Sequence, residues 1–237
     1  MGTHSDLHQN GSVIRYDGSV LDPFEPRLFD VAWLCSEGHY HGSSSGRGEA
    51  HFLNFGGRAM VLRPYRRGGM IGRFNRDLYF RTGLEQSRAF QEFSLLQSMR
   101  IDGLAVPRPI AVRVSPQGLF YRAALLTERI PDARPMEEVL REASLPVDVW
   151  QRVGAAIRRM HDASVDHTDL NCRNILIDSD AQVWLIDFDK CQKRPSGAWA
   201  QANLDRLERS LKKWPGLHWQ PCDWEALCAE YAKSDGT

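Results

Sequence analysis

The chain has 237 residues, of which 42% are hydrophobic and 25% are charged, a composition typical of a globular protein with a substantial core. Thirty basic and thirty acidic residues balance, so the overall charge does not indicate a nucleic-acid partner. Its five cysteines form no C-x-x-C pair, which argues against a disulfide framework or a zinc site and favours a reducing compartment. Neither a signal-peptide pattern nor an apolar stretch of 18 residues is visible, so we expect no leader and no membrane span.

The first half of the chain is predicted to be rich in β-strands. Residues 1–18 are polar, and we expect them to be frayed. Further along, an apolar run over residues 110–114 is predicted to pair with a second run over residues 120–127. We therefore expect an N-terminal β-rich lobe over residues 1–127, and the glycine-rich stretch at residues 42–48 makes it the candidate nucleotide-binding lobe.

A Gly/Ser-rich stretch at residues 42–48 precedes a predicted hairpin, with strands over residues 52–55 and 59–62 joined by a Gly-Gly turn. Glycine lets backbone N–H groups approach phosphate oxygens closely. Gly46 and Gly48 are therefore candidates for contact with nucleotide phosphates. The alternative is an ordinary flexible linker.

The segment 87–99 has apolar residues on one side of a predicted helix, with Glu92 among them. A buried glutamate needs a cation, and the preceding strand offers Arg63. We therefore expect an Arg63–Glu92 ion pair. It resembles the pairing of the strand lysine with the helix glutamate in kinases, which implies a role in nucleotide binding. The alternative is a solvent-facing Glu92 on an amphipathic helix.

The second half, residues 128–237, is predicted to be mainly helical and to form the catalytic lobe. Residues 125–131 run from a strand into a turn and are expected to form the hinge between lobes, where backbone near Glu128 would bind an adenine. Helices are expected over residues 136–142, 147–161 and 203–214.

The segment 167–189 contains an Asp, an Asn and a second Asp at informative spacings. Asp169 and Asn174 are separated by four residues, as in the kinase catalytic loop H-R-D-x-x-x-x-N. A second apolar run then ends at Asp187, in the position of the kinase D-F-G aspartate. The alternative is a simple β-hairpin with its turn at residues 178–180, in which these residues only cap turns.

Phosphoryl transfer requires mainly positioning and charge neutralisation. A carboxylate near the acceptor hydroxyl suits Asp169 as the catalytic base. An amide and a carboxylate suit Mg²⁺, which prefers hard oxygen ligands, so Asn174 and Asp187 are the predicted metal ligands.

Four motifs together resemble the bacterial 3-deoxy-D-manno-octulosonic acid (Kdo) kinases, relatives of the lipopolysaccharide heptose kinases in the protein-kinase-like superfamily. They are V-L-R-P-Y-R-R-G-G at residues 61–69, L-L-T-E at 125–128, H-T-D-L-N-C-R-N-I-L at 167–176 and I-D-F-D at 186–189. The resemblance extends from about residue 30 to 215. It implies an α+β, two-lobed protein-kinase-like fold with a β-rich N-terminal lobe and a mainly helical, shortened C-terminal lobe.

The resemblance further implies ATP- and Mg²⁺-dependent phosphorylation of the 4-hydroxyl of Kdo on a Kdo–lipid A precursor, during synthesis of the lipopolysaccharide inner core. The expected location is the cytoplasmic side of the bacterial inner membrane, as a peripheral protein. Two positions depart from the wider kinase pattern. Arg63 stands where protein kinases carry lysine, and Asp189 stands where they carry the D-F-G glycine.

A basic segment with interleaved aromatic residues surrounds the first of these motifs. It contains a single acid, Asp77, against the arginines Arg58, Arg63, Arg66, Arg67, Arg73, Arg76 and Arg81. Such a segment suits an anionic glycolipid at an anionic inner-membrane surface, and Arg66 and Arg67 are the predicted substrate-binding residues. The alternative is a solvated face with one or two arginines at the ATP site. No nucleic-acid module is visible, and we expect no nucleic-acid partner.

Two other functions remain open. Soluble kinases of the aminoglycoside or choline type share the H-x-D, Asn and Asp arrangement, but their cationic substrates favour an acidic surface rather than an arginine-rich one. A pseudokinase that acts as a binding module is the other alternative. The intact Asp169, Asn174 and Asp187 argue against it.

Overall fold

The computed structural model describes residues 4–44, 50–65, 79–80, 83–118 and 120–233, which form an α+β structure. The chain divides into two compact units. The first comprises Met1–Ser94 and Arg108–Arg129, and the second comprises Leu95–Pro107 and Ile130–Thr237. The division into functional lobes at residues 127 and 128 stays a prediction.

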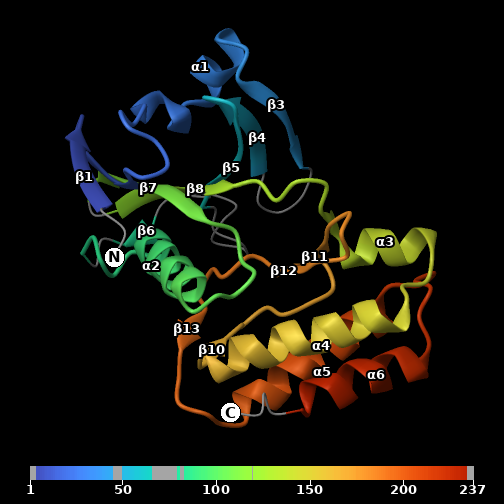
Figure 1. Ribbon diagram of the computed structural model, residues 1–237. Coiled ribbons are helices and arrows are strands. Elements are labelled where there is room, and N and C mark those ends of the chain that lie inside the picture. The colour runs from blue at the N-terminus through green and yellow to red at the C-terminus, as the bar shows by residue number, and fades with distance from the viewer. Residues whose placement is uncertain (1–3, 45–49, 66–78, 81–82, 119, 234–237) are drawn as a thin grey trace. The chain divides into compact units, whose positions relative to one another are not determined.

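The first unit is built on an antiparallel sheet (Figure 1). Its strands are β1 (His4–Gln9), β2 (Ser12–Asp17), β3 (Tyr40–Ser44), β4 (Ala50–Phe55), β5 (Arg58–Pro64), β6 (Tyr79–Phe80), β7 (Pro109–Gln117) and β8 (Phe120–Glu128). The order is β1-β2-β7-β8-β5-β4-β3, and β6 also pairs with β8. The two expected pairings, of β4 with β5 and of β7 with β8, are confirmed.

The expectation of a frayed N-terminus is wrong, because residues 4–17 form the β1–β2 hairpin at one edge of this sheet. Asn10 and Gly11 occupy its turn with φ of 50° and 74°. An Asn-Gly pair at positive φ is a strong signal for a two-residue hairpin turn. Ile14 is buried, and β2 pairs with β7, so the hairpin is secured by both packing and hydrogen bonds.

The two faces of β5 have different partners. Met60 and Leu62 point into an apolar core that also contains Leu28 of a short 3₁₀ helix and Leu34 of α1 (Val31–Ser36). Arg63 points to the opposite face, where it meets α2 (Arg88–Ile101). This alternation follows from the two-residue period of a strand. The helix expected over residues 87–99 is confirmed in α2 (Figure 1).

In its described residues, the second unit contains short strands and four further helices. The helices are α3 (Met136–Glu142), α4 (Val147–Asp162), α5 (Trp199–Lys213) and α6 (Pro221–Tyr231). The strands are β9 (Arg134–Pro135), β10 (Val165–Asp166), β11 (Ile175–Ile177), β12 (Val183–Leu185) and β13 (Gln192–Lys193). β11 pairs with β12 and β9, and β10 pairs with β13. The expected helices are confirmed, although α5 begins earlier than residue 203, and α6 was not expected.

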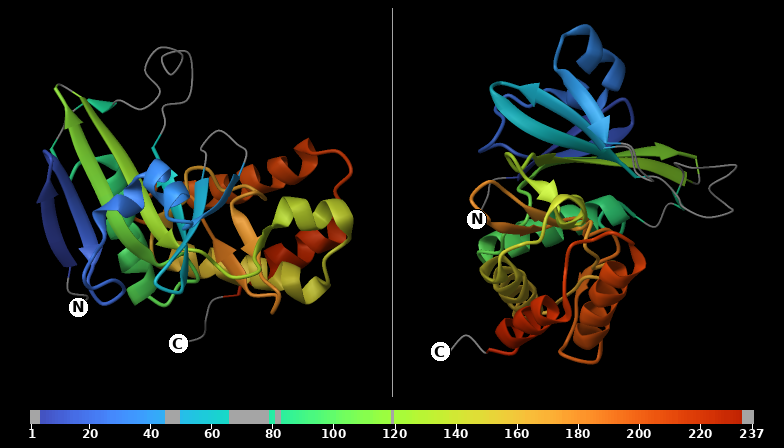
Figure 2. Two further views of the ribbon diagram at one scale, coloured as in Figure 1. Left: turned by 90° about the horizontal axis from the view of Figure 1, so that it is seen from above. Right: turned by 90° about the vertical axis from the view of Figure 1, so that its right-hand side faces the viewer.

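Helices α4, α5 and α6 lie side by side (Figures 1 and 2). His161 at the end of α4 joins all three, because its Nδ1 lies 2.9 Å from the Tyr231 hydroxyl of α6 and its ring makes a T-shaped contact with Trp199 of α5. Burial lowers the pKa of His161 to about 4, so the ring is neutral in this packing near pH 7. Along the described part of the chain, no helix has the length and apolar character required to cross a bilayer.

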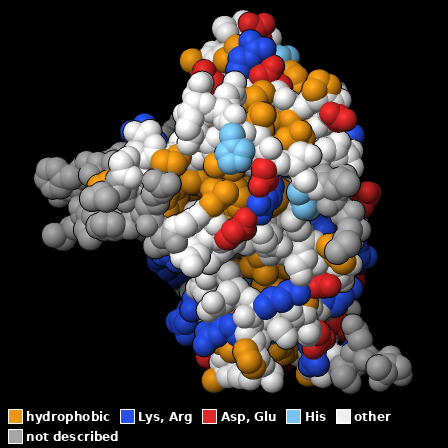
Figure 3. Space-filling model, turned by 90° about the vertical axis from the view of Figure 1, so that its left-hand side faces the viewer, with side chains coloured by type: hydrophobic (Ala, Val, Ile, Leu, Met, Phe, Trp, Pro, Cys, Tyr) orange, Lys and Arg blue, Asp and Glu red, His pale blue; other side chains and the backbone are white. Residues whose placement is uncertain are grey.

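Basic and acidic side chains are interspersed on the face shown in Figure 3, with apolar groups between them. This distribution agrees with the equal numbers of basic and acidic residues in the whole sequence. The described part of this face therefore does not present a surface of a single charge.

Gly154 allows α4 and α6 to approach each other closely. A Cβ atom added at this position would lie 2.3 Å from the carbonyl oxygen of Leu227 and 3.1 Å from the backbone nitrogen of Tyr231. Backbone atoms cannot move aside as a flexible side chain can. The Gly154→Ala variant is therefore expected to lose about 1–3 kcal/mol of unfolding free energy, although alanine is the better helix former.

Urea-induced unfolding of the purified protein measures this loss. Gln151→Ala is the matched control, because Gln151 is exposed on the same helix. We expect the control to unfold within about 0.5 kcal/mol of the original protein. Equal stability of the Gly154→Ala variant and the control would contradict the close approach of the two helices.

Candidate functional site

Three of the side chains singled out by the sequence lie on one continuous stretch of the second unit. After α4 and β10, the loop of residues 167–174 leads into β11. Asp169 is exposed in this loop, whereas Asn174 at its end and Asp187 after β12 are half-buried. The loop therefore presents a carboxylate to solvent while the other two side chains are partly enclosed.

The backbone at Asp169 is held by two side-chain amides. Asn171 Nδ2 and Asn174 Nδ2 donate to the Asp169 carbonyl oxygen over 2.8 Å and 2.9 Å. Because an amide has one nitrogen and one oxygen, this bond leaves Asn174 Oδ1 as the acceptor atom of that side chain. The two residues expected to act together are thus joined directly.

His167 connects this loop to the end of β12 through both ring nitrogens. Its Nε2 lies 3.0 Å from the Ile186 carbonyl oxygen, and its Nδ1 accepts the backbone N–H of Asp169 over 3.3 Å. A neutral imidazole with its proton on Nε2 satisfies both contacts. Burial lowers the pKa of His167, which favours this neutral form.

The β11–β12 hairpin brings Asp187 to the same end of the structure as Asn174. The hairpin pairs Ile175 with Leu185, and the pairing continues because the Ile186 N–H donates to the Asn174 carbonyl oxygen over 3.0 Å. Asp187 follows with φ of 65°, a left-handed conformation that aspartate tolerates better than most residues. This backbone turn directs the chain away from the hairpin at that residue.

Two side chains of helix α5, which the sequence reasoning missed, form hydrogen bonds with the backbone of the loop. Asn203 accepts the His167 N–H through Oδ1 over 2.9 Å and donates through Nδ2 to Asp166 Oδ1 over 2.9 Å. Ser210 Oγ accepts the Cys172 N–H over 3.0 Å. The loop is therefore anchored near both of its ends by the same helix.

A sequence signal for Asn203 was present. It lies on the apolar side of the helix together with Leu204, Leu207 and Leu211, and it is only 1% exposed. A polar residue on a buried stripe must find hydrogen-bond partners. The pattern thus indicates a buried polar contact, but it does not indicate the partner, which lies 36 residues earlier.

Cys172 has no sign of nucleophilic chemistry. Its side chain is buried, and burial raises the pKa of the thiol, so the reactive thiolate is disfavoured. Cys172 therefore acts as a small buried filler within the loop.

In the first unit, the expected ion pair between Arg63 and Glu92 is present. Glu92 is only 2% exposed, which excludes the solvent-facing alternative. Arg63 Nη2 donates to Glu92 Oε1, and the hydroxyl of Tyr65 donates to Glu92 Oε2. The contact of this cluster with a nucleotide stays a prediction.

Glu128 lies at the end of β8 and is half-buried, with its carboxylate 3.6 Å from Arg58 Nη1. The backbone N–H groups of Glu128 and Arg129 donate to the carbonyl oxygens of Arg108 and Ala59 over 2.9 Å and 3.0 Å. Because these two N–H groups already have acceptors, an adenine bound at this segment would have to form its hydrogen bonds with other atoms. Gly46, Gly48, Arg66 and Arg67, the remaining predicted site residues, lie outside the described residues.

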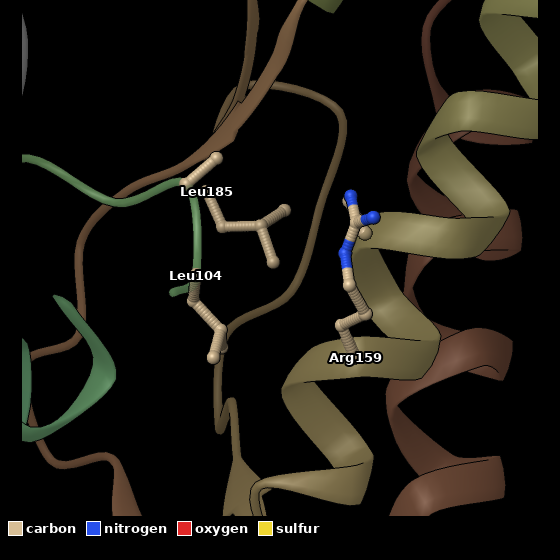
Figure 4. A pocket seen from close by; sticks show the side chains of 5 residues that line it. Leu104, Arg159 and Leu185 are labelled. Atoms are coloured by element: carbon tan, nitrogen blue, oxygen red, sulfur yellow. The ribbon is translucent and has the colours of Figure 1, made fainter. Parts of the chain in front are cut away.

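A small hollow in the second unit is distinct from these groups. It lies beside α4 and is lined by Leu104, Ala105, Ala156, Arg159 and Leu185 (Figure 4). Its lining is mostly aliphatic, and Asp169, Asn174 and Asp187 are not part of it. We assign it no role in the candidate site.

Comparisons with known proteins identify relatives over most of the chain. Residues 31–231 match the model of the lipopolysaccharide kinase (Kdo/WaaP) family. A curated 3-deoxy-D-manno-octulosonic acid kinase of Vibrio parahaemolyticus serotype O3:K6 (strain RIMD 2210633) is 45% identical over 222 residues, covering 92% of this chain and 93% of that protein.

Two further proteins of the same name show similar agreement. The one from Vibrio cholerae serotype O1 (strain ATCC 39315 / El Tor Inaba N16961) is 46% identical over 211 residues, which cover 89% of this chain and 88% of that protein. The one from Haemophilus influenzae (strain 86-028NP) is 41% identical over 201 residues, which cover 80% of this chain and 83% of that protein. The resemblance expected from the four motifs is confirmed.

The anchoring by Asn203 predicts a large effect of a substitution far from any catalytic side chain. Asn203→Leu keeps the branched shape and the number of side-chain heavy atoms but leaves the His167 N–H and the Asp166 carboxylate each without one buried partner. We expect the unfolding free energy to fall by about 1–3 kcal/mol.

Gln201→Ala is the control for chemical denaturation, because Gln201 is an exposed amide on the same helix that bonds to a nearby aspartate, Asp205. We expect this control to remain within about 0.5 kcal/mol of the original protein. Asn203→Leu with unchanged stability would show that the loop does not need this anchor.

Proposed function

The chain belongs to the lipopolysaccharide kinase (Kdo/WaaP) family, and on this premise we propose that it transfers the γ-phosphate of ATP to the 4-hydroxyl of Kdo on a Kdo–lipid A precursor. A kinase family implies the use of ATP as phosphate donor. The structural observation that supports the proposal most directly is the bond from Asn174 Nδ2 to the Asp169 carbonyl oxygen, which joins the proposed base and a proposed metal ligand in one loop.

Asp169 is the proposed catalytic base. This residue is exposed, while its backbone is held by His167, Asn171 and Asn174. The carboxylate therefore extends to solvent from a backbone that hydrogen bonds fix in place. As the acceptor oxygen bonds to the γ-phosphorus, the bond from that phosphorus to the β–γ bridging oxygen breaks. The acceptor's proton passes to the Asp169 carboxylate, and ADP leaves.

Asn174 and Asp187 are the residues that would hold Mg²⁺. They offer an amide oxygen and a carboxylate, which are hard ligands of the kind that Mg²⁺ takes from protein, with phosphates and water completing its shell. The Asn174 amide nitrogen is engaged at Asp169, which leaves its oxygen for a cation, and this fits the assignment. The ion supplies neutralisation of the charge that develops on the transferred phosphate.

The nucleotide phosphates are assigned to Arg63, which Glu92 orients, together with the glycine-rich segment of the sequence that contains Gly46 and Gly48. The adenine is assigned to the chain near Glu128. Arginine binds phosphate through a planar fork of donors, so its orientation matters more than that of a lysine ammonium group. The ion pair of the half-buried Arg63 with the buried Glu92 supports this part of the proposal.

The acceptor is assigned to Arg66 and Arg67, because a phosphorylated and carboxylated glycolipid calls for guanidinium groups. The location proposed with it is the cytoplasmic surface of the bacterial inner membrane, where basic residues near anionic lipids each contribute about 1 kcal/mol. The arginine-rich composition of residues 58–81 supports both assignments.

Incubation of the purified protein with ATP, Mg²⁺ and a Kdo–lipid A precursor tests the proposal. We expect transfer of phosphate to the glycolipid, at the 4-hydroxyl of Kdo by NMR, and none to aminoglycosides or choline. Phosphorylation of a cationic small molecule instead of the glycolipid would reject the proposed acceptor.

Replacement of the proposed base should separate catalysis from folding. Asp169→Asn is expected to lower the turnover number by about 10²–10⁴, because a positioned base contributes that much to proton transfer. Steady-state kinetics measures the loss, and circular dichroism checks the fold.

Asp180→Asn is the matched control, since Asp180 is an exposed aspartate in the turn between β11 and β12. It should retain turnover within about twofold of the original protein, as surface changes usually do. An Asp169→Asn variant as active as this control would remove Asp169 from the catalytic role.

A further inference from the structure

The carboxylate of Glu92 has a donor on each oxygen, and both donors come from the same strand end. Arg63 Nη2 bonds to Oε1, and the Tyr65 hydroxyl bonds to Oε2. A carboxylate that is 2% exposed is costly to bury unless its oxygens are bonded. Tyr65 itself is 6% exposed, so its bond is shielded from water.

Strand geometry explains why the two donors converge. Arg63 pairs with Leu125 of β8, and the pairing continues past β5 because the Tyr65 N–H donates to the Ala123 carbonyl oxygen over 2.9 Å. Residues two positions apart on a strand lie on the same face. The Arg63 guanidinium also lies over the Tyr65 ring, 5.5 Å from its centroid, so the three side chains form a single cluster.

We infer that Tyr65 is a positioning residue for nucleotide binding, which holds Glu92 and through it the guanidinium of Arg63. The inference rests on the proposed assignment of Arg63 to the nucleotide phosphates. Arginine and carboxylate groups favour a bidentate arrangement in which both oxygens face the guanidinium. The Tyr65 hydroxyl also bonds to Oε2, so it competes with the guanidinium for that oxygen. The bond thereby fixes the plane of the Glu92 carboxylate.

The role follows from having arginine at this position. A lysine ammonium is a compact point charge that meets a carboxylate and a phosphate in many orientations. A guanidinium is planar and has its donors in a fixed fork, so a rotation of its partner carboxylate turns the whole fork. An arginine here therefore needs a more tightly held glutamate than a lysine does, and Tyr65 provides the second contact.

Tyr65→Phe tests the inference, because it removes the hydroxyl and keeps the ring beneath Arg63. We expect KM for ATP to rise roughly tenfold, as for a lost bond to a charged partner, with kcat within about twofold. A raised KM with an unchanged kcat is expected when the lost interaction binds the ATP phosphates equally well in the ground state and in the transition state. A merely destabilised protein would lose active molecules and show a lower apparent kcat with KM unchanged.

Tyr121→Phe is the matched control. Tyr121 is also buried, at 4% exposed, and its hydroxyl accepts the Arg88 N–H at the start of the same helix over 3.3 Å. Its hydroxyl thus contacts helix α2 at the backbone of Arg88, so its removal should leave KM for ATP within about twofold. Both variants thus lose one hydroxyl next to α2.

A double-mutant cycle identifies Glu92 as the intermediary. In a Glu92→Gln background, where the charge is absent, Tyr65→Phe should change the dissociation constant for ATP by no more than about twofold, against roughly tenfold alone. Additive effects of the two substitutions would overturn the inference. So would a Tyr65→Phe variant whose KM for ATP matches that of Tyr121→Phe.

Calorimetric titration with ATP and Mg²⁺ keeps this result separate from the acceptor. If the original protein binds ATP but does not phosphorylate the Kdo glycolipid, the proposed function fails, and the affinities of the variants still decide the role of Tyr65. If the original protein phosphorylates the glycolipid and Tyr65→Phe binds ATP normally, only the inference fails.

Discussion

The neutral imidazole of His167 is the contact on which the arrangement of the second unit depends. One nitrogen accepts the Asp169 N–H, and the other lies at hydrogen-bond distance from the Ile186 carbonyl oxygen. A single buried ring thus connects the loop that carries the proposed base to the residue that precedes the proposed metal ligand. A protonated ring would have no acceptor for the Asp169 N–H, so burial, which lowers the pKa of His167, is part of the arrangement.

This contact constrains the helices as well. A buried ring next to buried backbone groups leaves polar atoms that water cannot reach, and each must find a partner within the protein. Asn203 and Ser210 meet this need from α5, and α5 in turn meets α4 and α6 around His161. Besides packing in the core, the helices therefore provide hydrogen-bond acceptors for the loop, namely Asn203 Oδ1 and Ser210 Oγ.

The sequence predicts features that depend on neighbours in the chain. The β4–β5 and β7–β8 pairings, the helices α2, α3 and α4, and the Asp169–Asn174 loop follow from local periodicity and spacing. The Arg63–Glu92 pair was also within reach, since a lone glutamate on an apolar stripe needs a cation. Asn203 and Tyr65 were not assigned, because a polar residue at a buried position does not by itself specify which group it meets. The β1–β2 hairpin was missed for a different reason, because its Asn-Gly turn outweighs the polarity of its strands.

Each of the two units contains a buried carboxylate that is held by the same kinds of donor. Glu92 in the first and Asp166 in the second are buried carboxylates, at 2% and 4% exposed. Each binds a guanidinium, from Arg63 or Arg194, and an uncharged donor, the Tyr65 hydroxyl or the Asn203 amide. A guanidinium alone offsets the charge but leaves the carboxylate free to turn, whereas a second donor on the other oxygen fixes its plane. Since Asp166 adjoins the proposed catalytic loop and Glu92 orients the proposed phosphate-binding arginine, the uncharged donors contribute orientation where the arginines contribute charge.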